Sequence, residues 1–262
     1  MTALYLATAV LGLLVGSFLN VVIHRVPRGE SLVRPGSRCP RCETPIAARH
    51  NVPVLGWLML HGRCHHCHEP ISVRYPLVEA VTAMLFVAVT ARLGLTPELP
   101  AYLYLTAVAV ALAVIDLDVK RLPNTIVLPS YVVGAALLAP AVIIDGAWGT
   151  AVRGLLAMTV LFGIYFALAL VYPGGMGFGD VKLAGLLGLY LGWMSWGTVW
   201  VGTLAGFIIG SLAGLTLMAV GRAGRRTAIP FGPAMLAGAF VAIFLGGPLA
   251  SWYVALLAPP GA

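Results

Sequence analysis

Two aspartates lie at the edges of long apolar segments, and each has a distinctive local setting. Asp116 opens the polar run Asp116-Leu-Asp-Val-Lys-Arg-Leu-Pro123, and Asp180 ends the glycine-rich turn Gly177-Phe178-Gly179-Asp180. A carboxylate at membrane depth costs a few kcal/mol or more, so such a residue is interpreted as functional and as having a partner. We therefore expect Asp116 and Asp180 to be partners of each other.

The chemistry of such a pair follows from their shared charge. Two carboxylates brought close together do not both ionise readily, so one keeps its proton and the pair acts as base and acid on a water molecule. This is the arrangement of an aspartic protease. Gly177 and Gly179 let the backbone leave helical geometry beside a cavity and leave room for an extended substrate. Taken alone, the turn also fits an ordinary interfacial turn with an aspartate at its edge.

Three neighbours of the pair have competing interpretations. Asp118 is about 200° around a helix from Asp116, so only one of them faces the partner; we choose the deeper Asp116 and interpret Asp118 as a solvated edge residue. Lys182 either tunes the pair electrostatically or anchors its helix end at the membrane interface. Asn124 is expected only to begin the next helix, after Pro123.

The four cysteines of the chain form two Cys-x-x-Cys pairs in one polar loop, namely Cys39, Cys42, Cys64 and Cys67. A tetrahedral zinc ion takes four thiolate or imidazole ligands, and two such turns each offer two sulfurs to one ion. The loop has little apolar core of its own, so we expect the zinc to be structural and its binding energy to stabilise the fold.

Other ligand sets for these cysteines remain open. Two disulfides or four idle thiols are the alternatives, and a reducing compartment disfavours the disulfides. All six histidines lie between residues 24 and 68, and His65, His66 or His68 could replace one sulfur.

The segments that must position these residues are membrane spans. The chain is 60% hydrophobic and 10% charged, with a mean hydropathy of +0.95, which is outside the range of soluble domains. Stretches of about 20 apolar residues recur along it, as spans require. The expected spans are near 2–23, 77–95, 99–117, 125–145, 151–172, 182–198, 200–220 and 232–256. The predicted fold is an all-α polytopic membrane protein with about eight transmembrane helices.

Basic residues predict the orientation. Eight arginines lie in the cysteine-bearing loop, and further Lys and Arg residues precede or follow the spans on the same side when eight spans are threaded. Positive charge accumulates on the cytoplasmic side, so both termini should face outward and both aspartates should lie at the cytoplasmic face. The charge of +7 is thus a topology signal, and we expect no nucleic-acid partner.

The sequence shows no obvious internal repeat and suggests three parts. We expect a first transmembrane helix at 1–24, a cytoplasmic zinc-binding loop at 25–76 and a seven-helix membrane peptidase domain at 77–262. Gly202, Gly206, Gly210 and Gly214 recur every fourth residue, which predicts close helix packing.

Several motifs together resemble the type 4 prepilin peptidases, which are bifunctional leader peptidases and N-methyltransferases of the GxGD aspartic protease type. They are Gly16-Ser-Phe-Leu-Asn20, the two cysteine pairs flanking Asn51-Val-Pro53, Arg74-Tyr-Pro-Leu-Val-Glu79, the Asp116 run and Gly177-Phe-Gly-Asp180-Val-Lys182. Asp116 and Asp180 match the catalytic aspartates of that family.

The resemblance implies more than the spacing shows. Such enzymes of the bacterial inner membrane cleave the basic leader of prepilins and pseudopilins of type IV pili and type II secretion. They then methylate the new N-terminus with S-adenosylmethionine. The cysteine loop belongs to the methylation-associated portion. No residue for the methyl donor is assigned.

Two functions of other classes compete with this interpretation. A proton-coupled transporter also uses carboxylates within the membrane. Against it, both aspartates lie near one surface, and the chain has no duplicated pair of broken helices. A zinc-stabilised scaffold that docks pilus-assembly proteins would need neither aspartate.

Overall fold

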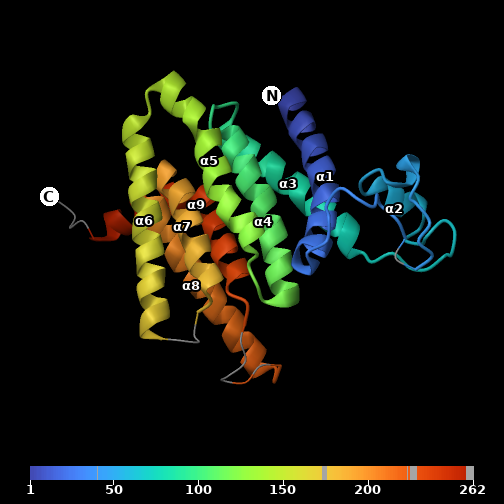
Figure 1. Ribbon diagram of the computed structural model, residues 1–262. Coiled ribbons are helices and arrows are strands. Elements are labelled where there is room, and N and C mark those ends of the chain that lie inside the picture. Colours follow the sequence, from blue (N-terminus) through green and yellow to red (C-terminus); the bar gives the residue numbers. More distant parts are fainter. Residues whose placement is uncertain (40, 173–175, 223, 225–228, 258–262) are drawn as a thin grey trace. The chain divides into compact units, whose positions relative to one another are not determined.

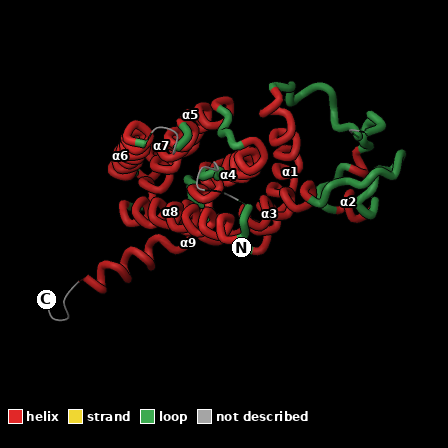
Figure 2. The backbone as a smooth tube through the Cα atoms, turned by 90° about the horizontal axis from the view of Figure 1, so that it is seen from below, coloured by secondary structure: helices red, strands yellow, loops and turns green. Residues whose placement is uncertain are grey.

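The structure, a computed structural model, describes residues 1–39, 41–172, 176–222, 224 and 229–257. Within these residues the regular elements are all helical, apart from two isolated bridges, which confirms the all-α prediction (Figure 2). The chain forms two compact units, Met1–Ala111 and Leu112–Ala262. The helix α4 (Leu99–Val119) contributes residues to both units.

The first unit is built on a close pair of helices, α1 (Thr2–Arg25) and α3 (Arg74–Leu93). Glycines on α1 allow the approach. A Cβ atom at Gly12 would lie 2.6 Å from an α3 Cα atom, and a Cβ atom at Gly16 would lie 2.7 Å from another. Small residues four apart let apolar helices pack closely where lipid removes the hydrophobic drive between them. The sequence therefore holds a second packing stripe, which we had not predicted.

A polar segment, residues 26–73, connects these two helices and is called the cysteine loop below. Its short elements are η1 (Val26–Arg28), η2 (Ala48–His50) and α2 (Leu55–Met59). The Arg25 guanidinium holds the start of the loop by donating to the carbonyls of Ser31 and Pro35, at 2.9 and 2.7 Å. These two backbone carbonyls of the loop thus accept hydrogen bonds from a charged side chain, in place of the backbone N–H groups that a helix would supply.

The second unit surrounds one buried helix, α7. Its helices beyond α4 are α5 (Asn124–Asp145), α6 (Trp148–Val171), α7 (Phe178–Met194), α8 (Trp196–Ala219) and α9 (Gly232–Leu257). Every residue of α7 from Leu183 to Trp193 is buried. Gly188 brings it close to α6, because a Cβ atom there would lie 2.6 Å from the Ala157 carbonyl oxygen. Figure 1 shows α6 and α7 side by side.

Arg153 of α6 donates hydrogen bonds to the backbone carbonyls at the C-terminal end of α7. Its Nε donates to the Gly192 carbonyl at 2.7 Å, and its Nη2 donates to the carbonyls of Trp193 and Met194 at 2.6 and 3.2 Å. The last carbonyls of a helix have no partner within the helix, and a cation there also complements the helix dipole. One guanidinium therefore supplies hydrogen bonds to the last backbone carbonyls of α7, so that these acceptors are not left unsatisfied.

The glycine stripe of α8 packs on α9, as its spacing predicted. A Cβ atom at Gly206 would lie 3.3 Å from Met235 Cα, and one at Gly210 would lie 2.6 Å from the Phe231 ring. On the α9 side, Gly238 lies directly against the Gly206 backbone. These contacts let the two backbones approach, which is the role that we expected.

Seven of the described helices are long and apolar enough to cross a membrane: α1, α3, α4, α5, α6, α8 and α9. The eighth long helix, α7, has 17 residues and is about 26 Å in length at 1.5 Å per residue. The chain is thus a multi-pass membrane protein, and the prediction of about eight spans agrees with these helices.

The expected span at 182–198 is wrong at both ends. The helix α7 begins at Phe178 and stops at Met194, and α8 begins at Trp196. Between them Ser195 is extended, and its Oγ accepts the backbone N–H of Thr198 at 3.0 Å, which makes it the N-cap of α8. Average hydropathy does not detect a single capping residue. Because α7 begins at Phe178, Asp180 lies inside the first turn of α7 and not ahead of it.

Candidate functional site

Asp116 lies near the end of α4, three residues before its last residue, and is buried with 4% of its surface exposed. Its Oδ2 accepts the backbone N–H of Gly232, the first residue of α9, at 3.1 Å. A Cβ atom at Gly232 would lie 2.7 Å from the same oxygen, so the absence of a side chain permits the contact. The N-terminus of a helix offers free N–H groups and a partial positive charge, which stabilise a buried carboxylate.

Asp180 also lies beside a helix N-terminus, which is that of its own helix α7. It is the third residue of α7, and its Oδ2 accepts the backbone N–H of Gly177 at 3.1 Å. An acidic side chain that reaches back to the residue before the helix is one half of a capping box; the other half is missing because Gly177 has no side chain. Each aspartate therefore accepts an N–H group at a helix N-terminus: Asp116, which belongs to α4, from the start of α9, and Asp180 from the residue before its own helix α7.

Leu122 links the two settings. A Cβ atom at Gly179 would lie 3.0 Å from Leu122 Cβ, and one at Gly232 would lie 3.2 Å from Leu122 Cδ2. The same leucine thus packs against the first turn of α7 and the first residue of α9. Asp116 and Asp180 are close enough for their charges to interact. The folded chain brings together two carboxylates that are 64 positions apart in the sequence.

Asp118 and Lys182 have other surroundings. Asp118 is exposed, whereas Asp116 is buried, as the helical rotation between them requires. The Lys182 ammonium donates to Asn124 Oδ1 at 2.8 Å and lies 4.7 Å from the centre of the Phe178 ring. Among the described residues, the ion pairs recorded lie in the cysteine loop and do not include Lys182 with either aspartate. The prediction that Asn124 only begins a helix was therefore incomplete.

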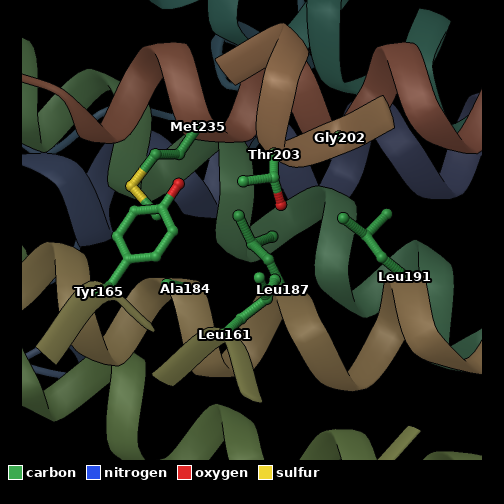
Figure 3. A pocket seen from close by; sticks show the side chains of 8 residues that line it. All are labelled: Leu161, Tyr165, Ala184, Leu187, Leu191, Gly202, Thr203 and Met235. Atoms are coloured by element: carbon green, nitrogen blue, oxygen red, sulfur yellow. The ribbon is translucent and has the colours of Figure 1, made fainter. Parts of the chain in front are cut away.

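A small apolar cavity lies elsewhere in this unit, between α6, α7, α8 and α9 (Figure 3). Its volume of about 10 Å³ is the least that holds one water molecule, so it is no substrate site. Tyr165 and Met235 line one side of it. Tyr165 is near enough to Asp180 for the charge of the carboxylate to act on its hydroxyl group.

Sequence reasoning missed Leu122, Gly232 and Asn124 as members of this site. Gly232 stands directly before Pro233, and proline favours the first turn of a helix, so the start of α9 was readable. The contact between Gly232 and Asp116 was not predictable from the sequence, because the two residues are 116 positions apart. Gly174 and Gly175, two further glycines of the turn, lie outside the described residues.

The four cysteines form one cluster in the first unit. Their sulfur atoms all lie within 4.8 Å of one another, with 3.8 Å between Cys39 and Cys67 and 3.9 Å between Cys42 and Cys64. All four are free thiols, so the disulfide alternative is wrong. No histidine belongs to a cluster of this kind in the described part of the chain. Four sulfurs about 2.3 Å from a central zinc would be about 3.8 Å apart, so the spacing fits a tetrahedral ion.

The two halves of the cluster repeat one another. Arg-Cys-x-x-Cys-x-x-Pro occurs at 38–45 and again at 63–70. In both, the backbone N–H of the first cysteine is bonded to a carbonyl five residues on, Thr44 or Glu69, and an isolated bridge joins the ends. The expectation of no internal repeat is therefore wrong for this loop, because eight residues without hydropathy periodicity are too short a signal to stand out.

Local hydrogen bonds prepare the thiols for metal binding. Hydrogen bonding by Thr44 lowers the pKa of the Cys42 thiol to about 6. The backbone amides of Cys67 and His66 lower the pKa of Cys64. The amide of Glu69 acts in the same direction on Cys67, but burial and the other thiols raise its pKa to about 12. The lowered pKa values of Cys42 and Cys64 favour the thiolate form, which is the form that binds a metal ion.

Glu79 of α3 ties the cysteine loop to the helix pair. It is 8% exposed, and its Oε2 accepts the backbone N–H of Val54 at 2.7 Å. Val54 has a φ of 60°, which is costly for a β-branched residue and is maintained by the surrounding contacts. Nearby, Trp57 Nε1 donates to the Ile71 carbonyl at 3.0 Å and closes the loop across its base.

The chain is similar to known families over most of its length. Residues 10–93 match the bacterial peptidase A24 N-terminal domain, and residues 103–250 match the type IV leader peptidase family. The first range contains the four cysteines, and the second contains Asp116, Asp180 and Gly232.

Curated proteins named prepilin leader peptidase/N-methyltransferase are similar to it as well. The one from Myxococcus xanthus is 44% identical over 222 residues, which are 83% of this chain and 64% of that protein. The one from Aeromonas hydrophila is 38% identical over 269 residues, 92% of this chain and 91% of that protein. The one from Pseudomonas aeruginosa is 34% identical and covers 96% of this chain and 94% of its own length. No solved structure shows significant similarity.

Proposed function

Because the chain belongs to the type IV leader peptidase family, a family of aspartic peptidases, we propose that it cleaves the leader peptide of prepilins or pseudopilins and N-methylates the new N-terminus. Both activities are in the names of its relatives. The observation that supports the peptidase activity most directly is that Asp116 and Asp180 each accept a backbone N–H at a helix N-terminus and lie near enough for their charges to interact.

In the proposed mechanism, the two carboxyl groups share one proton. The ionised member takes a proton from a water molecule as it attacks the peptide carbonyl, and the protonated member donates to the leaving amine. The helix N-termini favour the ionised form of each carboxylate, while the repulsion between the two carboxylates favours protonation of one of them. The glycines at 177 and 179 leave space beside Asp180 for an extended peptide.

The site is proposed to face the cytoplasm in a bacterial inner membrane, with both termini outside. The distribution of Lys and Arg supports this orientation, because threading eight spans through a membrane puts the basic loops on the same side as Asp116 and Asp180. A basic leader peptide would remain on the same, cytoplasmic side of the membrane. The partners in this proposal are the prepilin or pseudopilin and the lipid bilayer.

We assign Cys39, Cys42, Cys64 and Cys67 as the ligands of one structural zinc ion. The sulfur spacing and the closed set of four thiols support it, since a catalytic zinc keeps one position open. The ion would join the two halves of the cysteine loop and neutralise its thiolates. The methyl donor is proposed to be S-adenosylmethionine, on the strength of the names of the relatives.

The test is cleavage of a matched prepilin by purified enzyme, with the N-terminus of the product measured by mass spectrometry. Asp116→Asn and Asp180→Asn should each lower kcat by about 10²- to 10⁴-fold, as expected for loss of an acid or base. Asp118→Asn is the matched control and should keep its activity. Cleavage at the wild-type rate by either of the first two variants would remove that residue from the mechanism.

The same aspartate variants, measured in other assays, address the other classes of function. A docking scaffold would leave both aspartate variants fully active in cells. The transporter alternative has no support from the relatives described above, which are peptidases by name. Proton-driven uptake of a solute into proteoliposomes, if lost in the Asp116→Asn variant, would support the transporter alternative.

A further inference from the structure

The helix α5 contacts the start of α7 at one residue in two ways. Asn124 Oδ1 accepts a hydrogen bond from the Lys182 ammonium at 2.8 Å. The Tyr131 hydroxyl donates to the backbone carbonyl of Lys182 at 2.5 Å. Asn124 and Tyr131 are seven positions apart, about two helical turns, so they lie on one face of α5. One contact holds the side chain of Lys182, and the other holds its backbone.

The contacted residue is in the same turn as the candidate catalytic aspartate. Lys182 follows Asp180 by two positions within the first turns of α7. A helix moves as a rigid body over such a distance, so a contact that fixes Lys182 also fixes the backbone of Asp180. A displacement of 1 Å at a reacting group lowers the rate by up to about 100-fold, so such a contact matters for catalysis.

Tyr131 fits where α7 has no side chain. A Cβ atom at Gly185 would overlap the Tyr131 hydroxyl and would lie 3.3 Å from Phe162. The hydroxyl group of Tyr131 therefore occupies the space that this glycine leaves, which fixes the rotation of α7 about its axis. Because Asp180 projects from that helix, its direction depends on the same rotation.

Lys182 takes part in this arrangement without contacting the aspartates. Its ammonium lies between Asn124 and the Phe178 ring, at 2.8 and 4.7 Å. Neither partner lies at the carboxylate of Asp180, whose recorded hydrogen bond is to Gly177. Lys182 is therefore held by the protein, which differs from a lysine that extends freely into the lipid headgroups.

We propose that Asn124 and Tyr131 are positioning residues, which hold the first turn of α7 through Lys182 so that Asp180 stays beside Asp116. This inference rests on the proposed function, in which the two aspartates cleave the leader peptide. The positioning residues do not touch the substrate in this scheme. Their effect is on the geometry of the carboxyl pair, and hence on kcat rather than on KM.

The first experiment is a double-mutant cycle on prepilin cleavage with Asn124→Ala, Lys182→Met and the two together. Each single variant should lower kcat about 10-fold and leave KM within about twofold, since only the reacting geometry changes. The double variant should be no slower than the slower single variant, because both changes break one contact. Additive losses of about 100-fold would show that Asn124 does not act through Lys182 and would overturn this part.

The second experiment compares two tyrosine hydroxyls between α5 and α7. Tyr131→Phe should lower kcat about 10-fold. Tyr190 is ten positions after Asp180 on α7, and its hydroxyl packs against Gly134 of α5. Tyr190→Phe removes this hydroxyl and should leave kcat within about twofold, although it changes the melting temperature. If both variants lose kcat equally, α5 has only a general packing role and the proposal is wrong.

Failure of this inference is distinguishable from failure of the proposed function. Asp116→Asn and Asp180→Asn are measured in the same assay. If they abolish cleavage while Asn124→Ala and Tyr131→Phe remain at the wild-type rate, the positioning proposal alone is overturned. If the aspartate variants stay active, the peptidase mechanism itself is wrong, whatever the other variants do.

Discussion

The Oδ2 atom of Asp116 accepts the backbone N–H of Gly232 at 3.1 Å, which joins the end of α4 to the first residue of α9. This contact explains how a carboxylate is kept at a buried position of an apolar helix. The N–H group belongs to a helix N-terminus, where no other backbone acceptor competes for it. The space at Gly232 is filled by the carboxylate itself.

Gly232→Ala should therefore impair catalysis. The added Cβ atom would lie 2.7 Å from Asp116 Oδ2, so the carboxyl group must move. We expect prepilin cleavage to lose about 100-fold in kcat, the effect of a shift of about 1 Å at a reacting group. Gly247→Ala on the same helix is the control, because nothing lies within 4 Å of its Cβ position. Equal activity of the two variants would contradict the role given to Gly232.

Arg153→Ala should destabilise the second unit. It removes donors from the carbonyls of Gly192, Trp193 and Met194 and leaves these acceptors at the buried end of α7. Loss of charged hydrogen bonds is expected to cost about 2–4 kcal/mol, measured by thermal unfolding in detergent. Arg153→Lys supplies one donor in place of a planar fork and should recover only part of the loss. Full recovery by lysine would show that charge alone matters there.

Glu79→Ala should loosen the cysteine loop without affecting the aspartate pair. Its carboxylate is the acceptor for the Val54 N–H, which would otherwise be unsatisfied in a strained turn. Limited trypsin digestion should cut the arginine-rich loop faster in this variant. Glu79→Gln keeps an acceptor oxygen and should remain resistant. Unchanged digestion of the alanine variant would show that the loop is held by other contacts.

Removal of the thiols should remove the metal. We expect one zinc per chain in purified protein by elemental analysis, and none in a Cys39→Ser/Cys64→Ser double variant. The loop should then lose protection against trypsin, because metal binding contributes to its folding. Asp180→Asn is the control and should retain its zinc. A double variant that keeps its metal would refute the ligand assignment.

Local sequence was enough to predict the helices and the cysteine cluster. Long apolar stretches form helices in a membrane because each backbone group must be satisfied within its own segment. A Cys-x-x-Cys turn is likewise local, so its spacing alone indicates a shared ion. The junction at Ser195 was placed wrongly because one capping hydroxyl outweighs an apolar average.

The partners of the aspartates came from packing between distant helices. Asp116 meets Gly232, and Lys182 meets Asn124, only because glycines and a shared leucine let α4, α5, α7 and α9 approach at particular heights and rotations. Hydropathy periodicity is nearly flat in these helices, so it does not say which face meets which neighbour. The sequence thus predicts which segments are apolar helices, whereas the direction of each side chain depends on close contacts made between helices.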